Sequence, residues 1–216
     1  MNLNTLLSAD HKVMRLINRM NVLDIIREQA PISRVKIAGV TGLRKPTISS
    51  IVNELIGEGL VYEDSPESSS VGRRPINLRF NNSCRIYGSV DVSRSKTSVS
   101  VCDLGGQVLK SKRLPTLCGR GREFFTECAR ELVSMLDSFD RPAAGIGVVV
   151  PCPVNSREGK IFCDRHLDWS ELNVRGVFEH YFDLPVHVEN DARAAALAEL
   201  WFAPAVRGGR IDSTGK

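Results

Sequence analysis

The chain has 216 residues, with 29 basic and 25 acidic side chains, so its formal net charge is only +4. Hydrophobic residues make up 42% and charged residues 25%, which is typical of a globular protein and excludes collagen-like, fibrous or wholly disordered chains. The longest uncharged stretch, between Arg141 and Arg157, contains three prolines and is shorter than the roughly 18 apolar residues of a membrane span. No basic start followed by an apolar core marks a secretory signal, so we expect a cytoplasmic protein with no membrane partner.

Six cysteines and four histidines are spread singly along the chain, and they form no CxxC pair and no other metal-ligand spacing. We interpret the cysteines as reduced thiols that pack as small apolar side chains. Neither a metal nor any other cofactor is therefore expected.

The excess positive charge lies mainly in the first part of the chain. Residues 1–82 hold eleven basic and eight acidic side chains, whereas residues 83–216 hold eighteen and seventeen. An excess of three charges does not by itself indicate a nucleic-acid partner, because a basic surface is usually just a solvated one. The elements that carry the individual arginines and lysines are more informative than the sum.

A first helix is predicted by apolar residues that recur at helical spacing and share one side, which we expect to be buried. These residues are Val13, Leu16, Ile17, Met20, Leu23 and Ile26. Pro31 then interrupts the chain, and Ser33 is a suitable N-cap for a short second helix over residues 34–40.

A third helix follows after a tight turn. Gly42 can take the left-handed conformation that the turn needs, and Pro46 suits the first turn of a helix, where its missing N–H costs little. Gly57 and Gly59 end this helix. A short helix, a glycine turn and a second helix in this order predict a helix-turn-helix.

The second helix of this pair presents a polar face of short hydrogen-bonding and cationic side chains, which suit base edges and phosphates in the major groove. These residues are Arg44, Lys45, Thr47, Ser49, Ser50 and Asn53. An ordinary helical hairpin with a solvated face would show a similar pattern. We favour double-stranded DNA as the partner, because the following segment supports it independently.

Two short alternating stretches, at residues 60–63 and 72–80, flank a serine-rich link and predict a β-hairpin. After a helix-turn-helix, such a hairpin is the wing of a winged helix. Arg73 and Arg74, within a GRRP motif, can reach a narrow and electronegative minor groove. We therefore predict a winged helix-turn-helix DNA-binding domain over residues 1–82.

The remainder of the chain predicts the element order βββαβαβα. The expected strands are 85–92, 97–103, 107–114, 144–150 and 185–188, and the expected helices are 122–139, 171–182 and 191–201. Three meandering strands followed by parallel strands joined by helices form one mixed sheet. The fold class is thus α+β and α/β, with one ribonuclease-H-like lobe of the actin and sugar kinase superfamily over residues 83–203. The polar tail over residues 204–216 is expected to be disordered.

With these segments in place, residues 10–203 resemble the ROK family of sugar-responsive repressors and sugar kinases. The resemblance rests on the GRRP motif, on Gly88-Ser89-Val90-Asp91, on Gly145-Ile146-Gly147 leading to Pro151-Cys152-Pro153-Val154, and on Pro185-Val186-His187-Val188-Glu189-Asn190-Asp191-Ala192. In ROK kinases the Asn and Asp of the last motif bind sugar hydroxyls, and the Asp takes the proton from the attacking hydroxyl. The resemblance implies that Asn190 and Asp191 contact a sugar, with Asp191 at the position of the family's base. From the residues alone, the same pair would be interpreted as a helix N-cap.

Several positions depart from the pattern of the ROK kinases. Ser93, Arg94 and Ser95 stand where the kinases have a Gly-Gly-Thr turn whose backbone approaches ATP phosphates. Further departures are Cys152, Asn155 and Arg193. In the family, the zinc motif and the second phosphate loop come after the segment that matches this chain. We therefore expect a chain that is truncated at its C-terminus.

These observations predict a DNA-binding transcriptional regulator, a repressor of the ROK type that controls sugar-related genes. We expect it to bind a palindromic site as a homodimer, with a sugar or sugar phosphate as effector of a partial sensing domain. No catalytic residue is expected. Two alternatives stay open, namely an ATP-dependent sugar kinase that uses Asp191, and a non-functional remnant with an exposed lobe face.

Overall fold

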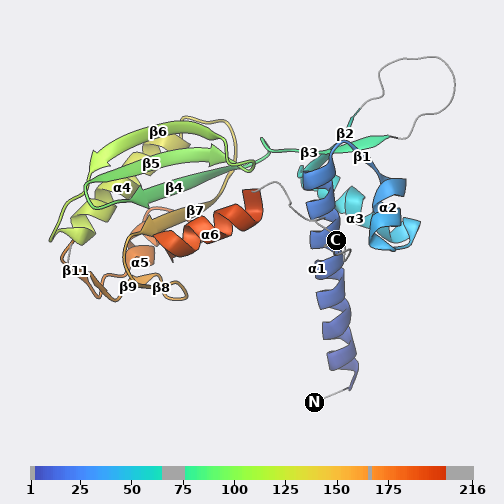
Figure 1. Ribbon diagram of the computed structural model, residues 1–216, viewed down its shortest axis with the longest axis horizontal. Coiled ribbons are helices and arrows are strands. Elements are labelled where there is room, and N and C mark those ends of the chain that lie inside the picture. The colour runs from blue at the N-terminus through green and yellow to red at the C-terminus, as the bar shows by residue number, and fades with distance from the viewer. Residues whose placement is uncertain (1–2, 65–75, 165–166, 203–216) are drawn as a thin grey trace, which may run out of the picture. The chain divides into compact units, whose positions relative to one another are not determined.

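The computed structural model describes residues 3–64, 76–164 and 167–202 (Figure 1). By its contacts the chain divides into two compact units, Met1–Asn81 and Asn82–Lys216, which we call unit 1 and unit 2. The predicted wing arginines Arg73 and Arg74 lie outside the described residues, and so does the predicted tail.

Unit 1 combines three helices with a small antiparallel sheet (Figure 1). The helices are α1 (Leu3–Gln29), α2 (Arg34–Thr41) and α3 (Lys45–Gly57), and the strands are β1 (Ile32–Ser33), β2 (Val61–Asp64) and β3 (Asn77–Phe80). The strand order is β1-β3-β2, so the predicted pairing of the two hairpin strands is confirmed. Strand β1 was not predicted, because two residues are too few to show an alternating pattern.

The core of unit 1 is a cluster of buried aliphatic side chains contributed by all three helices and all three strands. Its members are Val22, Ile26, Ile32, Ile37, Ile48, Ile51, Val52, Leu55, Val61 and Leu78. Because each helix presents one apolar side to this cluster, burial of that side stabilises the packing of α2 and α3 against the end of α1.

The first part of α1 corrects the sequence prediction. Val13, Leu16, Ile17 and Met20 are 45 to 56% exposed, although their spacing predicted one buried side. The physical reason is geometric, since α1 extends past α2 and α3 (Figure 1). Among residues 12–29 of α1, whose burial is described, those that join the core begin at Val22.

Unit 2 is built on a five-stranded mixed sheet of order β12-β7-β4-β5-β6. The strands are β4 (Ile86–Val92), β5 (Lys96–Asp103), β6 (Val108–Pro115), β7 (Ala143–Val150) and β12 (Val186–Asn190). Neighbours β4, β5 and β6 are antiparallel, whereas β7 runs parallel to both β4 and β12. The predicted meander followed by parallel strands is therefore confirmed.

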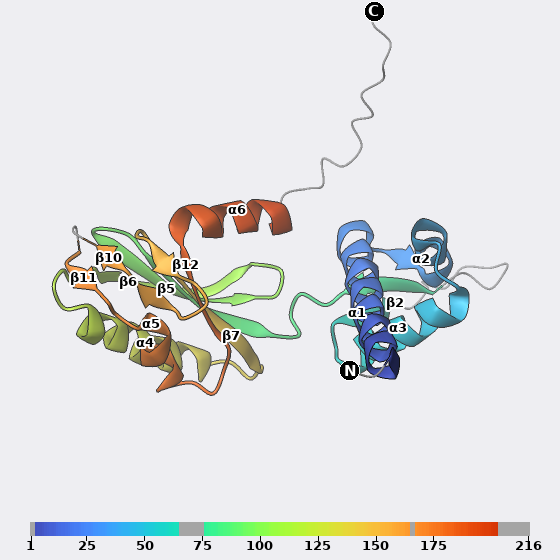
Figure 2. The ribbon, with the colours of Figure 1, turned by 90° about the horizontal axis from the view of Figure 1, so that it is seen from below.

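Helices cover both faces of this sheet. Helices α4 (Gly121–Leu136) and α5 (Val174–Glu179) lie on one face, and α6 (Asp191–Phe202) lies on the other (Figure 2). Both α4 and α5 end earlier than predicted, and α5 also begins later. α6 buries none of its residues, whereas α4 buries seven of its sixteen.

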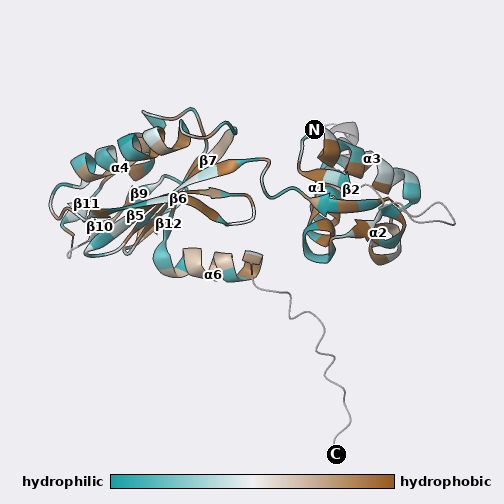
Figure 3. Ribbon diagram, turned by 90° about the horizontal axis from the view of Figure 1, so that it is seen from above, coloured by the Kyte–Doolittle hydropathy of each residue, from teal (hydrophilic) through white to brown (hydrophobic). Residues whose placement is uncertain are grey.

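Close packing between α4 and the sheet requires a glycine on the central strand. Leu132 of α4 is fully buried, and a Cβ added at Gly88 of β4 would lie 2.6 Å from its Cδ2. Nearby, Phe124 stacks on Trp169 with ring centroids 5.2 Å apart. Burial in this core raises the pKa of the Cys128 thiol to about 12. Figure 3, in which the ribbon is coloured by hydropathy, shows hydrophobic residues along the central strands of the sheet.

The segment between β7 and α5, which we predicted to be a loop, contains two short hairpins. Their strands are β8 (Val154–Asn155) with β9 (Lys160–Ile161), and β10 (Cys163–Asp164) with β11 (Trp169–Ser170). Strands of two residues have no readable period, which explains why the sequence did not reveal them. Within the described ranges, no helix is long and apolar enough to cross a membrane.

Candidate functional site

The turn between α2 and α3 has the conformation that the sequence predicts. The hydroxyl of Ser33 accepts a hydrogen bond from the Lys36 amide (3.4 Å) and caps α2. Gly42 adopts a left-handed φ of +69°, and its amide donates to the Ala38 carbonyl (3.0 Å), which closes the helix. Pro46 lies in the first turn of α3. These features fix the angle at which α3 leaves α2.

Helix α3 has two contrasting sides. Ile48, Ile51, Val52 and Leu55 are buried against α1 and α2. The other side exposes five of the six residues proposed to read DNA, and the sixth, Ser49, is half-buried. The exposed residues are Arg44, Lys45, Thr47, Ser50 and Asn53. The structure therefore gathers all six at the surface of one helix and its N-cap.

Two of these polar side chains are already oriented by contacts within unit 1. The Asn53 Oδ1 atom accepts a hydrogen bond from Arg34 (3.3 Å), which also forms an ion pair with Glu63 of β2 (2.6 Å). The Ser50 hydroxyl donates to Glu54 (3.2 Å). Arg34 could not be identified from the sequence, because its partners Asn53 and Glu63 lie 19 and 29 positions away along the chain.

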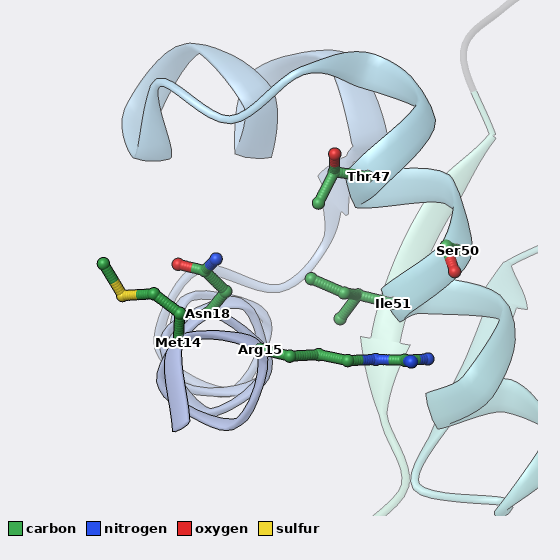
Figure 4. Close-up of a pocket in the computed structure, with 6 residues that line it drawn as sticks. All are labelled: Met14, Arg15, Asn18, Thr47, Ser50 and Ile51. Atoms are coloured by element: carbon green, nitrogen blue, oxygen red, sulfur yellow. The ribbon is translucent and has the colours of Figure 1, made fainter. Parts of the chain in front are cut away.

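A hollow of about 340 Å³ separates the outer edge of α3 from α1 (Figure 4). It is lined by Met14, Arg15, Asn18, Thr47, Ser50 and Ile51. In Figure 4 the side chain of Arg15 extends from α1 toward α3, where its guanidinium binds Glu54 at 2.5 Å. The hydrogen bond from Arg15 lowers the pKa of Glu54 below its ordinary value, so this carboxylate is ionised at neutral pH.

The predicted wing is described only at its base. Strands β2 and β3 pair antiparallel from Val61 opposite Phe80 to Asp64 opposite Asn77. Arg79 reaches across this pair and binds the Asp64 carboxylate at 2.6 Å. Arg73 and Arg74 lie outside the described residues, so their proposed contact with the minor groove stays a prediction.

In unit 2, Asn190 ends β12 and Asp191 begins α6. The Asn190 Oδ1 atom accepts hydrogen bonds from the amides of Ala192 (3.1 Å) and Arg193 (3.4 Å). The Asp191 carboxylate accepts from the same Ala192 amide at 2.7 Å. Both side chains thus cap α6, as the residues alone indicated.

The Asn190 amide also ties this cap to a second loop. Its Nδ2 atom donates to the Asp191 carboxylate (2.9 Å) and to the Cys152 carbonyl (3.3 Å). Asp191 is exposed and Asn190 is half-buried, so the carboxylate is accessible to a ligand from solvent. The structure therefore brings Asn190, Asp191 and the loop after β7 together at the carboxyl ends of two parallel strands.

Arg175 is an organising residue that sequence analysis did not identify. From α5 its guanidinium donates to the carbonyls of Val186 (3.0 Å) and Ser156 (2.8 Å) and so connects β12 to the β8–β9 hairpin. Glu189 reinforces this connection, because its carboxylate accepts from the Ser156 hydroxyl and from the backbone N–H of Asn190, both at 2.9 Å.

The turn between β4 and β5 is closed by its own hydrogen bonds. The Ser93 amide donates to the Lys96 carbonyl (3.1 Å), and the Thr116 hydroxyl donates to the Ser93 carbonyl (2.8 Å). All three side chains of residues 93–95 are exposed at this turn. Among the residues that the structure describes, no three His, Cys, Asp or Glu side chains come close enough to hold a metal ion.

Comparison with known proteins gives a consistent family assignment. Residues 87–207 match the sequence pattern of the ROK family. The xylose repressor of Caldicellulosiruptor bescii is 29% identical over 198 residues, which are 90% of this chain and 50% of that protein. The DNA-binding transcriptional dual regulator NagC of Escherichia coli is 25% identical over 193 residues, which are 88% of this chain and 48% of that protein.

The fold is similar to that of a solved relative. The crystal structure of a ROK family transcriptional regulator, a homologue of the Escherichia coli MLC protein, superposes with a TM-score of 0.71 at 25% identity. The superposition covers 88% of this chain and 49% of that one. The chain thus spans about half the length of the curated relatives that it matches.

Proposed function

Because the chain belongs to the ROK family, we propose that it is a DNA-binding repressor of sugar-related genes, with a winged helix-turn-helix in residues 1–82. The observation that carries this proposal is the two-sided character of α3. Its apolar side is buried, and its other side exposes cations and short hydrogen-bonding groups beside a helix-turn-helix turn. The similarity to a protein named xylose repressor and to one named DNA-binding transcriptional dual regulator supports this proposal.

In this proposal α3 enters the major groove of duplex DNA. Arg44 and Lys45, at its N-terminal end, bind backbone phosphates, where the positive end of the helix dipole adds to their charge. The other outward side chains contact base edges, and Arg34 holds Asn53 in place for such a contact. These base-reading residues are Thr47, Ser49, Ser50 and Asn53. The wing arginines Arg73 and Arg74 reach the minor groove.

Unit 2 is proposed to be one ribonuclease-H-like lobe, over residues 83–203, that carries part of a sugar-sensing site. Asn190 and Asp191 contact hydroxyl groups of a sugar or sugar phosphate, and the accessible carboxylate of Asp191 is the stronger acceptor of the two. An effector regulates DNA binding only if it binds one state of the protein better than the other. Two copies of the chain occupy the two halves of a palindromic site.

We do not propose the alternative of an ATP-dependent sugar kinase. Close approach of the backbone to a phosphate is favoured by glycine, because a side chain occupies the space that the phosphate oxygens need. The turn at residues 93–95 instead carries three side chains, and it is closed by hydrogen bonds from Ser93 and Thr116.

A mobility-shift assay tests the DNA-binding function. The whole chain is mixed at low salt with the DNA upstream of its own gene, and it is compared with the double variant Arg44→Ala/Lys45→Ala. The control variant Arg122→Ala/Arg130→Ala removes the same charge from exposed positions of α4. We expect the first variant to bind at least about tenfold more weakly and the control to bind like the parent. Absence of a shift by the parent chain, or an equal loss in the control, contradicts the proposal.

A second assay tests the sugar site separately. Release of bound DNA is measured with a panel of pentoses, hexoses and their phosphates, using the parent chain and Asp191→Ala. We expect one sugar class to alter binding by the parent only, because Asp191 lies far in sequence from every proposed DNA contact. If the sugar alters DNA binding by Asp191→Ala as it does for the parent, Asp191 is not part of the sensing site. That outcome leaves the DNA-binding proposal intact.

A further inference from the structure

Two outward side chains of α3, Ser50 and Asn53, are each bonded to a charged neighbour within unit 1. The Asn53 Oδ1 atom lies 3.3 Å from a nitrogen of Arg34, and the Ser50 hydroxyl lies 3.2 Å from the Glu54 carboxylate. Ser50 and Asn53 are both exposed, and they are three positions apart, so they share one side of the helix. The two charged neighbours decide which hydrogen-bonding groups this side offers to a ligand.

The orientation of the Asn53 amide follows from the chemistry of Arg34. A guanidinium has five N–H donors and no acceptor, so the amide atom that faces it must be the oxygen. The Nδ2 group, which carries two donors, is then turned away from Arg34, and no residue in the described part of the chain accepts a hydrogen bond from it. Asn53 therefore presents a donor to solvent.

Arg34 is itself held in place. Its other terminal nitrogen forms an ion pair with Glu63 of β2 at 2.6 Å, and its side chain is only 25% exposed. Hydrogen bonds between charged groups are stronger than those between neutral ones, so this ion pair anchors the guanidinium. The Asn53 oxygen thus meets a donor in a fixed position.

The opposite polarity holds at Ser50. The hydrogen bond from Arg15 (2.5 Å) lowers the pKa of Glu54, and an ionised carboxylate only accepts hydrogen bonds. The single hydroxyl proton of Ser50 is therefore donated to Glu54, which leaves the lone pairs of the Ser50 oxygen for a ligand. Ser50 thus presents an acceptor.

We propose that Arg34 and Glu54 are positioning residues, which give the outer side of α3 a fixed donor at Asn53 and a fixed acceptor at Ser50 and so determine the bases that it recognises. The inference rests on the proposed binding of α3 in the major groove and names the base edges that fit. Asn53 fits guanine, whose N7 and O6 atoms are both acceptors, and rejects cytosine, which offers an amino group. Ser50 fits the amino group of cytosine or adenine and rejects guanine and thymine.

The spacing and the rigidity of the two groups both suit base recognition. Ser50 and Asn53 are separated by about 4.5 Å along the helix axis, and successive base pairs by about 3.4 Å, so the two residues face neighbouring base pairs. A wrong base would place donor against donor or acceptor against acceptor and leave both groups without a partner. Because the internal bonds exist before DNA binds, less conformational freedom is lost on binding.

Selection of bound duplexes from a random-sequence DNA pool, followed by sequencing, tests the assignment with the whole chain. Asn53→Ala identifies the base position that Asn53 contacts, because base preference is lost there. We expect the parent to prefer guanine over cytosine at that position by about tenfold or more. The charge exchange Arg34→Glu/Glu63→Arg keeps an ion pair but places an acceptor beside Asn53. The amide should then turn over, and the preference should change to cytosine or adenine.

The matched control exchanges the charges of another ion pair. Lys112→Glu/Glu131→Lys alters a partly exposed pair in unit 2 and should select the same sequence as the parent. The measured quantity is the ratio of bases at one position, so a general change in affinity does not affect it. If the exchange at Arg34 and Glu63 prevents binding, Arg34→Gln, whose amide donates or accepts, should still bind and should reduce the preference for guanine.

Glu54→Gln tests the acceptor at Ser50 in the same way. The glutamine amide can donate to Ser50 as well as accept from it, so the hydroxyl proton is no longer committed to this neighbour. Ser50→Ala identifies the base position concerned. We expect the parent to prefer cytosine or adenine there, and we expect this preference to fall several-fold in Glu54→Gln.

Each other outcome overturns the inference. A guanine preference that survives the change at Arg34 removes its positioning role, and an unaltered preference in Glu54→Gln removes that of Glu54. A parent preference for cytosine at the Asn53 position, or a selected sequence that Asn53→Ala leaves unchanged, contradicts the assigned donor. A parent chain that enriches no sequence rejects the proposed function and this inference with it. A sequence that the parent and every variant select alike rejects this inference alone, so the two failures are distinguishable.

Discussion

The guanidinium of Arg15 on α1 lies 2.5 Å from the carboxylate of Glu54 on α3, although the two residues are 39 positions apart in the sequence. Four residues further along each segment, Arg19 binds Glu58, the residue that follows α3, at the same distance. Two such contacts in register fix how α1 lies against the proposed recognition helix. They thereby orient the polar face of α3 relative to the exposed apolar residues of α1, among them Leu16 and Met20.

The contact between Arg15 and Glu54 makes unit 1 sensitive to acid. Since Arg15 lowers the pKa of Glu54 below its ordinary value of 4.5, the carboxylate stabilises the folded state fully above that value. This contribution is lost as the pH falls through the lower pKa of the folded state. Denaturant unfolding at a series of pH values from neutral to about pH 3 should therefore show that the unfolding free energy falls less in Glu54→Gln than in the parent chain. The same loss in the variant would show that other carboxylates are responsible.

The left-handed residue of the turn between α2 and α3 is expected to require glycine. Gly42 has a φ of +69°, so Gly42→Ala should lower the unfolding free energy of unit 1 by about 1–2 kcal/mol. Gly57, the last residue of α3, is not left-handed and has no other atom within 4 Å of an added Cβ. Gly57→Ala is the matched control and should leave stability unchanged or slightly higher. Chemical denaturation measures both variants, and equal effects would refute the conformational argument.

The packing of α4 on the sheet predicts a second glycine requirement. An added Cβ at Gly88 would lie 2.6 Å from Leu132, so Gly88→Ala should destabilise unit 2 by about 1–3 kcal/mol. Gly147→Ala on the adjacent strand β7 meets no atom within 4 Å and should be tolerated. In the double variant Gly88→Ala/Leu132→Ala, the total loss of unfolding free energy should be smaller than the sum of the losses in the two single variants, because the clash is removed. Additive losses measured by thermal unfolding would place the cause elsewhere.

The salt dependence of DNA binding tests whether Arg44 and Lys45 contact phosphates. Each phosphate contact adds about one unit to the slope of log affinity against log salt concentration. Fluorescence anisotropy should therefore show a slope about two units shallower for Arg44→Ala/Lys45→Ala. Asn53→Ala, which removes a proposed base contact, should weaken binding to the specific site and keep the slope. A slope unchanged by loss of both cations would exclude them as phosphate contacts.

The sequence predicted the elements whose pattern is long and regular. The period of α4, the alternation of β4 and β5 and the turn chemistry of Gly42 and Pro46 all correspond to the structure. Two-residue strands such as β1 and β8 are too short for a period to be visible. The exposure of Leu16 and Met20 also could not be read from spacing, because an apolar stripe has the same period whether its partner is the chain's own core or another molecule.

The candidate sites show the same limit. The outward residues of α3 were identified from the sequence, because helical geometry alone places them on one side. Arg34 and Arg175 were not, since their partners come from distant elements that only folding brings together. For Asn190 and Asp191 the residues indicated an N-cap, which the hydrogen bonds confirm, and their proposed contact with a sugar rests on the family resemblance.

The central claim is that the outward face of α3 contacts DNA, and an NMR titration of the isotope-labelled whole chain with its upstream DNA tests it most directly. We expect the largest changes in amide chemical shift within Lys45–Gly57 and the turn at Gly42, with amides of the sheet in unit 2 little affected. Changes confined to unit 2, or spread evenly over basic residues of both units, would contradict a recognition helix in this chain.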